Sequence, residues 1–247
     1  MKIEQYRYDL HMHSCLSPCG DNDMTPNNMV NMAALLGCQI LAITDHNTCK
    51  NAPAAMRVGE QAGVLVIPGM ELCTSEEAHV VCFFETAEDA LAFDAYVEAH
   101  TMHIPNRPEI FGDQLIMDEE DEITGKIDHL LITATDISVN DVQTLVKQYN
   151  GVAFPAHVDK DAYSVTASLG AIPPEAEFTA AELSGSADRE KQLALHPELE
   201  NMIILQDSDA HYLHLMREDM GSVELPELSV KALLDLFRGC GAGRFIN

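Results

Sequence analysis

The chain has 247 residues, and its 40 acidic side chains against 14 lysines and arginines give a formal net charge of −26. A chain of this length buries about three quarters of the surface it exposes when unfolded, so we expect one large domain over residues 1–247. Nucleic-acid binding through phosphate contacts needs a basic face, and the few cations form no cluster in the sequence. We therefore do not expect nucleic acid or an anionic membrane as a partner. An anionic substrate would then have to be attracted by bound divalent cations.

The first ten residues, MKIEQYRYDL, lack the apolar core of a signal peptide, and no segment approaches the ~20 apolar residues of a membrane span. These features predict a cytoplasmic protein. The seven cysteines are odd in number and lie mostly in apolar runs, which favours reduced thiols over a disulfide framework. Cys15 and Cys19 lie in a polar turn. We interpret them as loop cysteines, with a redox pair or a metal site as the alternative.

Strand and helix patterns alternate along the first hundred residues. Thr25 and Pro26 are typical of a helix start, and Gly37 and Gly63 are typical of residues that end helices. The predicted strands are 3–10, 39–44, 64–68 and 79–84, and the predicted helices are 26–36, 52–62 and 87–99.

The pattern breaks over residues 104–127, where prolines, a glycine and an acidic segment predict a small insertion, either a hairpin or a cap over a site. Beyond it we predict strands at 130–134, 152–155, 178–183 and 202–206, and helices at 139–149, with Ser138 as its N-cap, and 229–237. Repeated βα units make a parallel sheet with crossover helices, and a barrel is the expected closure in a chain of this length.

Imidazoles and carboxylates follow the ends of five predicted strands. These residues are Asp9, His11 and His13; Asp45 and His46; Glu71; His157; and Asp209 and His211. One histidine after one strand is more often a hydrogen-bonded loop residue than a ligand. Five such groups at equivalent strand ends are better explained by a shared metal centre, because barrel enzymes build their sites on this face.

The residue types fit zinc, manganese or iron, since neutral imidazoles and carboxylates are ligands for all three. His11 and His13 lie on the same side of an extended chain because side chains repeat every two residues, and Asp209 and His211 repeat this spacing. Glu71 is the candidate bridge between two ions. Two ions roughly 3.5–4 Å apart would lower the pKa of a shared water and neutralise a phosphate.

Taken together, these motifs resemble the polymerase and histidinol phosphatase (PHP) superfamily. The matching segments are Asp9-Leu-His11-Met-His13-Ser, Thr44-Asp45-His46, Pro68-Gly-Met-Glu71, Ala156-His157 and Ser208-Asp209-Ala-His211. The resemblance implies a distorted seven-stranded (β/α)7 TIM-like barrel that binds two or three divalent metal ions and hydrolyses phosphate esters.

The resemblance also implies a ligand set. One ion would be held by His11, His13, Glu71 and Asp209; a second by Glu71, His79 and His157; and a third by His46, His211 and one residue of the loop after the H-x-H pair. Asp21 is favoured for that loop ligand, with Asp23 and Cys19 as alternatives. His79 begins its predicted strand rather than ending it, so a core or edge histidine is the alternative there.

Four further residues receive supporting roles. Asp9 and Asp45 are expected to orient imidazoles through their other ring nitrogen. Lys160 and Arg217 are candidate phosphate contacts because cations are scarce, although a solvated surface side chain is the commoner case.

These expectations combine into a metal-dependent phosphoesterase in which a metal-bound hydroxide attacks phosphorus. His11, His13, Glu71, His157, Asp209 and His211 would act through the metal centre. We expect a small phosphomonoester or nucleotide as substrate. The alternatives are a nuclease or proofreading module that acts on oligonucleotide ends, and a non-catalytic metal-binding partner protein.

Overall fold

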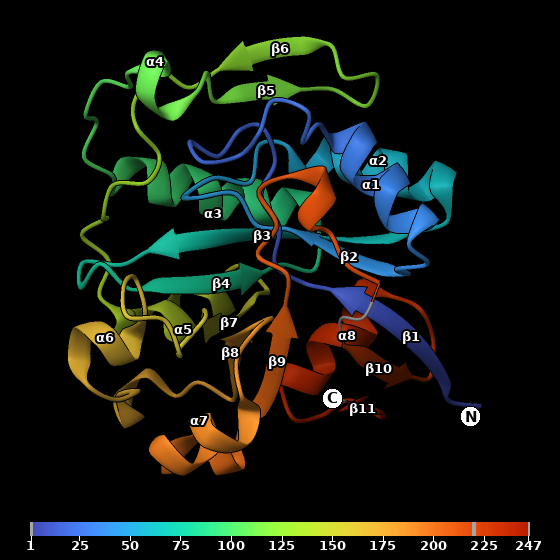
Figure 1. The fold of residues 1–247 in the computed structure, drawn as a ribbon, viewed down its shortest axis with the longest axis vertical. Coiled ribbons are helices and arrows are strands. Elements are labelled where there is room, and N and C mark those ends of the chain that lie inside the picture. The colour runs from blue at the N-terminus through green and yellow to red at the C-terminus, as the bar shows by residue number, and fades with distance from the viewer. Residues whose placement is uncertain (1, 219–220, 247) are drawn as a thin grey trace.

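The computed structural model describes residues 2–218 and 221–246, which form an α/β fold (Figure 1). Its main sheet has seven strands in the order β11-β10-β1-β2-β3-β4-β7. Their bounds are β1 (Glu4–Asp9), β2 (Ile40–Ile43), β3 (Leu65–Cys73), β4 (His79–Phe83), β7 (Val152–Pro155), β10 (Ser222–Leu225) and β11 (Arg244–Ile246). The strands predicted in the first hundred residues and at 152–155 are confirmed, and β3 continues further than predicted.

A second, parallel pair of strands continues the curl of the sheet. It consists of β8 (Ala180–Ser184) and β9 (Ile203–Asp207). Beside β7, the amide of Val158 donates to the carbonyl of Glu182 at 2.9 Å. Beyond β9, the amide of His13 donates to the carbonyl of Ala210 at 3.0 Å. These bonds connect β7 to β8, and the chain after β9 back to the chain after β1.

The α/β class and the curled sheet agree with the sequence, but a regular series of seven parallel βα units is not observed. β4 runs antiparallel to both β3 and β7, and β10 runs antiparallel to β1. Only five residues separate β3 from β4. A parallel pairing needs a crossover of a dozen or more residues. A connection of this length therefore makes the two strands antiparallel.

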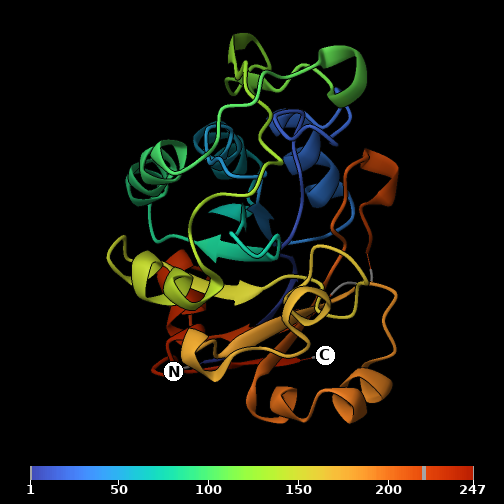
Figure 2. The same ribbon diagram turned by 90° about the vertical axis from the view of Figure 1, so that its left-hand side faces the viewer.

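Helices α1, α2 and α3 gather on one side of the sheet (Figures 1 and 2). The helices are α1 (Pro26–Leu35), α2 (Ala52–Ala62), α3 (Ala87–Ala99), α4 (Pro108–Phe111), α5 (Val139–Lys147), α6 (Val165–Leu169), α7 (Arg189–Leu195) and α8 (Val230–Phe237). Thr25 caps α1 by accepting a hydrogen bond from the amide of Asn28, and Ser138 caps α5. Gly63 ends α2 at φ 74°, a left-handed conformation that glycine adopts without strain.

The segment 104–127 forms α4 and a hairpin of β5 (Leu115–Met117) and β6 (Ile123–Lys126), which lies beyond α1 and α2 in Figure 1. Asn51 fixes the hairpin to the body of the protein. Its side-chain amide donates to the carbonyl of Leu115 at 3.1 Å and its carbonyl oxygen accepts from the amide of Met117 at 3.0 Å. One of the two sequence interpretations of this segment, the hairpin, is therefore observed.

The predicted strand at 130–134 is wrong, since these residues form a turn. Leu131 is buried, which accounts for the apolar pattern. Side chains rather than a neighbouring strand satisfy its backbone. The Gln114 side chain accepts from the Leu131 amide at 3.0 Å, and the Asn47 amide donates to the Leu131 carbonyl at 2.7 Å and the Thr133 carbonyl at 2.8 Å.

The core lies on both faces of the sheet. On one face Phe154 stacks on Phe237 of α8 with ring centroids 5.5 Å apart, and Phe83 packs edge-on against both rings. Across the described ranges, no helix has the length and apolar character needed to span a membrane.

Candidate metal centre

Nearly all the predicted ligands meet at one edge of the curled sheet. They come from the segments that follow β1, β2, β7 and β9, from the second half of β3 and from the first residue of β4. The convergent residues are His11, His13, His46, Glu71, His79, His157, Asp209 and His211. Glu71 is 1 % exposed and occupies the middle of the group. Of the predicted metal ligands, Asp21 alone lies outside it.

The first group of ligand atoms comprises His11, His13, Glu71 and Asp209. His13 Nε2 lies 3.3 Å from Glu71 Oε2 and 3.2 Å from Asp209 Oδ1. His11 Nε2 lies 3.3 Å from Glu71 Oε1, 3.3 Å from His13 Nε2 and 3.7 Å from Asp209 Oδ1. Four potential ligand residues therefore direct nitrogen or oxygen atoms into one small volume.

The second group forms around the other side of the Glu71 carboxylate. His79 Nδ1 lies 2.9 Å and His157 Nε2 lies 3.1 Å from Glu71 Oε1. His157 holds a φ of 29°, a left-handed conformation that is rare outside glycine and costs of order 1–3 kcal/mol. Backbone strain of this kind is concentrated at functional sites, and here it accompanies a ring that faces Glu71.

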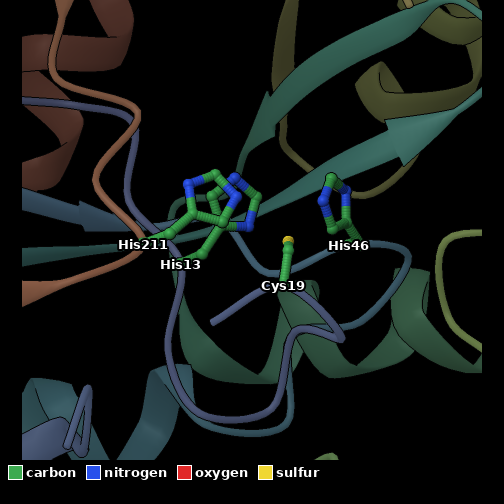
Figure 3. Close-up of side chains that lie close together, drawn as sticks. All are labelled: His13, Cys19, His46 and His211. Atoms are coloured by element: carbon green, nitrogen blue, oxygen red, sulfur yellow. The ribbon is translucent and has the colours of Figure 1, made fainter. Parts of the chain in front are cut away.

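The third group contains a residue that was only an alternative in the sequence. His13, Cys19, His46 and His211 each offer one potential ligand atom, and these atoms all lie within 4.8 Å of one another. Figure 3 shows the Cys19 sulfur pointing into the space between the His13 and His211 rings and the His46 ring. The Asp21 carboxylate instead accepts a hydrogen bond from the amide of Asp23 at 2.9 Å within the loop.

The donor set fits divalent metal ions. A tetrahedral site with bonds of about 2.0 Å to nitrogen or oxygen has ligand atoms about 3.3 Å apart, which is the spacing found in the first group. His46 Nδ1 and His79 Nε2 are buried and have no hydrogen-bond partner, although His46 Nδ1 lies 3.0 Å from Glu71 Oε2. Buried polar atoms without a partner are costly, and coordination would satisfy them.

Glu182 contacts a predicted ligand and was missed by the sequence analysis. It lies in β8, is completely buried, and places its two carboxylate oxygens 3.0 and 2.9 Å from His11 Nδ1. The contact holds the Nδ1 proton and turns Nε2 toward Glu71, which is the carboxylate–histidine arrangement that supports metal ligands. A carboxylate inside the apolar segment Ala180–Leu183 was the available signal, because a buried strand rarely contains an unpaired acid.

The supporting role expected of Asp9 differs in the structure. Its Oδ1 accepts from the amide of Ser208 at 3.1 Å, and no contact with an imidazole ring is found for it among the described hydrogen bonds. Asp45 contacts an imidazole indirectly, through a serine hydroxyl. It accepts from the hydroxyl of Ser17 at 2.6 Å, and Ser17 Oγ lies 3.1 Å from His13 Nδ1. Asp9 thus fixes the backbone after β9, whereas Asp45 positions the His13 ring through Ser17.

Charge is balanced within the centre. Burial opposes the charged ring of His13, but Asp209 and Glu71 outweigh burial and raise the pKa of His13 to about 9. Burial also opposes the charged ring of His46, and there Cys19 and Glu71 raise the pKa to about 9. Both rings therefore carry a proton at neutral pH when no metal competes for the nitrogen.

Two other groups shift in the opposite direction. Burial lowers the pKa of His211, and repulsion by His13 adds to the effect, so that the pKa is about 3. For Glu71, burial favours the neutral acid, but the adjacent His79 and His11 rings outweigh burial and hold the pKa well below its usual range. Glu71 is therefore an anion, and the His211 ring is neutral and able to coordinate a metal ion at all ordinary pH values.

The centre opens to solvent through a pocket of about 210 Å³, whose lining residues include Cys19, His46, His211, Tyr163 and Lys160. Lys160 stands at the mouth with its side chain 41 % exposed, and its Nζ lies 2.5 Å from Asp209 Oδ2. Arg217 is exposed, donates to the carbonyl of Gly185 at 3.2 Å and is absent from the pocket lining. The structure thus places Lys160, and not Arg217, beside the predicted ligands.

A larger pocket of about 670 Å³ lies elsewhere, between β9, β11 and the end of α8. Arg189 and Arg244 are its charged lining residues, and none of the described residues that line it carries an imidazole, carboxylate or thiol. The described residues of that surface therefore offer no ligands for the metal chemistry described above.

Comparison with known proteins agrees with the geometry. The PHP domain family matches residues 9–152, which is more than half of the chain. The exoribonuclease "5'-3' exoribonuclease Rnm" of Salmonella typhimurium is 38 % identical over 76 residues, covering 30 % of this chain and 25 % of the relative. The phosphoribosyl 1,2-cyclic phosphate 1,2-diphosphodiesterase of Eggerthella lenta is 39 % identical over 64 residues, covering 26 % and 23 %. The chain thus spans about a quarter of each of these relatives.

Among solved structures, the lesion-specific endonuclease PfuEndoQ of Pyrococcus furiosus superposes with a TM-score of 0.68 at 16 % sequence identity, covering 98 % of this chain and 58 % of that one. A second structure of Endonuclease Q, with a TM-score of 0.66, contains a 27-mer duplex with an abasic lesion at the active site. At this identity the likeness concerns the fold.

These relatives correct one expectation from the sequence. The net charge of −26 argued against nucleic acid as a partner. An endonuclease with a similar fold holds duplex DNA, and an exoribonuclease is among the sequence relatives, so the net charge does not exclude nucleic acid as a substrate class. The inference from charge failed because the total charge of a chain does not describe a site in which bound cations can contact phosphates.

Proposed function

The chain belongs to the PHP domain family, whose members are metal-dependent hydrolases, and we propose that it is a phosphoesterase acting on a small phosphate ester or nucleotide. One observation carries the proposal: the buried carboxylate of Glu71 is surrounded by imidazoles at the base of a pocket whose mouth carries a lysine. Paired metal sites of this composition suit phosphate hydrolysis, because ions bound there supply an activated water and neutralise the phosphate charge.

The residues of the chain have separate parts in this reaction. Glu71 and Asp209 would supply the negative charge that holds divalent ions, and Glu182 would keep the His11 ring oriented toward them. Lys160 pairs with Asp209 and reaches the pocket mouth, where its ammonium would contact a phosphate oxygen of the substrate. The buried position of the histidines excludes bulk water, which strengthens each of these electrostatic contacts.

Pocket size favours a small substrate. Ligand pockets for drug-sized molecules have volumes of about 300–1,000 Å³. The volume of about 210 Å³ here suits a phosphate group with the first atoms of its alcohol, and leaves the remainder of a larger substrate outside. The relative from Eggerthella lenta is a phosphodiesterase of a phosphoribosyl cyclic phosphate, which supports a substrate of this size.

A second candidate is hydrolysis at the end of an RNA or DNA strand. The similarity to an exoribonuclease favours it, since a terminal nucleotide presents the same phosphate group to the same pocket. The two candidates differ in what binds outside the pocket. A strand would contact the surface around the mouth, and its binding would weaken steeply as salt increases.

The test is release of phosphate or of mononucleotides by the protein reconstituted with Mn²⁺ or Zn²⁺. The substrates are sugar phosphates, histidinol phosphate, nucleotides, a cyclic phosphodiester and a single-stranded oligonucleotide. Glu71→Gln and a chelated sample serve as negative controls, and Glu60→Gln, a change of the same kind at an exposed site in α2, serves as the matched control.

We expect metal-dependent turnover of one small ester, lost in Glu71→Gln and retained in Glu60→Gln. Faster turnover of the oligonucleotide than of every small ester would replace the first candidate by the second. Metal binding without turnover of any substrate would contradict both, and would support a non-catalytic metal-binding protein.

A further inference from the structure

The loop between β1 and α1 is built to hold Cys19 in one place. The amide of Ser17 donates to the carbonyl of Ser14, and the amide of Gly20 donates to the carbonyl of Ser17, both at 3.0 Å. A Cβ atom at Gly20 would lie 2.2 Å from the Ser14 carbonyl oxygen, so only glycine fits directly after Cys19. The amide of Asp21 then donates to the carbonyl of His211 at 2.9 Å. This bond attaches the part of the loop that follows Cys19 to the segment that carries His211.

We propose that Cys19 is a metal ligand and that, with His46 and His211, it forms a site for a thiophilic divalent ion such as Zn²⁺, Co²⁺ or Fe²⁺. The inference rests on the proposed function only in one respect: the third group of potential ligands (Cys19, His46 and His211) belongs to the same candidate metal centre. It replaces the carboxylate expected in this loop by a thiolate, which changes the preferred metal.

The geometry selects three ligands from the four residues in Figure 3. His13 Nε2 faces Asp209 and Glu71 at 3.2 and 3.3 Å, and its Nδ1 lies 3.1 Å from Ser17 Oγ, so both of its nitrogens are engaged elsewhere. His211 Nδ1 donates to the carbonyl of Asp209 at 2.8 Å. The proton is therefore on Nδ1, and Nε2 has the lone pair that can coordinate a metal ion.

His46 supplies the independent evidence for a ligand. Its ring is buried, and its Nδ1 lies 3.0 Å from Glu71 Oε2 without making a hydrogen bond to it or to any other described group. A buried imidazole nitrogen without a partner is costly unless an ion coordinates the ring. Its potential ligand atom lies within 4.8 Å of those of Cys19 and His211, and all three residues line the pocket.

The two other candidates in the loop are excluded by their positions. Asp21 uses its carboxylate to accept a hydrogen bond from Asp23, and Asp23 is exposed. Neither residue is a member of any ligand cluster found among residues 2–218 and 221–246. The Cys19 side chain, in contrast, points toward the rings of His13, His46 and His211 (Figure 3).

A cysteine and two histidines are three protein ligands, the number at which catalytic zinc sites leave one position open. The open position would face the pocket, because all three side chains line it. Thiolate and imidazole select zinc, cobalt or iron over manganese and magnesium, which prefer oxygen ligands. The other two groups of the centre contain carboxylate and imidazole only, so the third position has the strongest preference for a thiophilic ion.

Spectroscopy of the cobalt-loaded protein tests the proposal without relying on activity. The purified full chain is stripped of metal and titrated with Co²⁺ under reducing conditions. The near-ultraviolet thiolate-to-cobalt charge-transfer absorption and the number of ions bound are then recorded. Cys19→Ser is compared with Cys240→Ser, which removes an exposed thiol far along the chain, and with Asp21→Asn.

We expect the wild type, Cys240→Ser and Asp21→Asn to show the thiolate band, and Cys19→Ser to lose both the band and one equivalent of bound ion. Zinc should also protect Cys19 from alkylation in the wild type, as read by peptide mass spectrometry. Circular dichroism of Cys19→Ser checks that the variant is folded. Cys19→Asp, a second variant, should regain the ion without the band.

A cobalt-loaded wild type without the thiolate band overturns the proposal, as does a Cys19→Ser protein that keeps the band or the full number of ions. Failure of the proposed function is a separate result. If the protein shows the thiolate band but hydrolyses no phosphate ester, the proposal for Cys19 stands and the proposed function fails. If it hydrolyses a phosphate ester but shows no band, the proposed function stands and the proposal for Cys19 fails.

Discussion

His79 Nδ1 lies 2.9 Å from Glu71 Oε1, although His79 begins β4 and Glu71 lies in the second half of β3. The contact exists because β3 and β4 are antiparallel neighbours, with Cys73 paired to His79. The first residue of β4 therefore reaches the edge where the other strands end. The antiparallel pairing thereby brings His79, which does not end its strand, to the candidate metal centre.

Glu182→Gln should weaken metal binding without unfolding the protein. The amide keeps the shape of the side chain but removes the negative charge that contacts His11 Nδ1 at 2.9 Å. Carboxylates that hydrogen-bond a metal-binding histidine contribute about 10–100-fold to metal affinity or activity. We expect Glu182→Gln to lose metal affinity in that range. Competition with a metal-sensitive dye measures the affinity. Glu175→Gln, at an exposed site, is the matched control, and equal affinities for the two variants would contradict the assigned role.

Metal uptake should release protons at neutral pH. The pKa of His13 is raised to about 9 in the metal-free protein, so the ring is charged at pH 7, while a ligand nitrogen must be free of its proton. Apparent affinity should therefore increase as pH rises from 6 toward 9. Calorimetric titration with Zn²⁺ in buffers of different ionisation enthalpy measures the number of protons released. A heat that is independent of the buffer would show that the ring was already neutral.

The same shift makes the stability of the metal-free protein depend on pH. A pKa of about 9 in the folded state, against about 6.5 in the unfolded chain, stabilises the fold below pH 6.5, and the effect is lost as pH rises through 9. The metal-free protein should therefore unfold more easily at pH 9.5 than at pH 7. Bound metal adds its own stabilisation by mass action. Urea unfolding at both pH values, with and without Zn²⁺, gives the four free energies to compare.

Lys160→Met should raise KM for a phosphate substrate more than it lowers kcat. Its ammonium lies at the pocket mouth, 2.5 Å from Asp209 Oδ2, where it would contact a bound phosphate. A hydrogen bond to a charged group contributes about 1.5–3 kcal/mol, which corresponds to a loss of roughly 10–100-fold in kcat/KM. Lys160→Arg should recover part of the loss, and Lys191→Met, at an exposed site in α7, should have no effect. An unchanged KM in Lys160→Met would remove the residue from the substrate site.

Asn51→Ala should destabilise the attachment of the hairpin. Asn51 is completely buried and bonds Ser14 Oγ, the Leu115 carbonyl and the Met117 amide. Its removal leaves buried partners unsatisfied, at a cost of about 1–3 kcal/mol. Chemical unfolding should show the loss, and hydrogen exchange should be faster in β5 and β6 than in β2. Asn140→Ala, an exposed position in α5, provides the comparison.

Local patterns in the sequence were sufficient for many elements. Helix α2 begins and ends at the predicted residues Ala52 and Ala62, because Gly63 adopts the left-handed conformation that ends a helix. Helix α3 likewise matches its predicted span. The segment 130–134 was not predictable in this way, since its apolar pattern records the burial of Leu131 and not a strand pairing. Its backbone partners, Asn47 and Gln114, are distant in sequence.

The sequence by itself determined which residue types gather at the ends of β1, β2, β3, β7 and β9, because side-chain spacing and strand position can be read locally. Only the tertiary structure decided that Glu182 contacts His11, that β4 is antiparallel and delivers His79, and that Cys19 rather than Asp21 faces His46 and His211. Each of these contacts depends on strand direction or loop closure between distant segments. Local spacing contains no record of such pairings, because packing of the whole chain sets them.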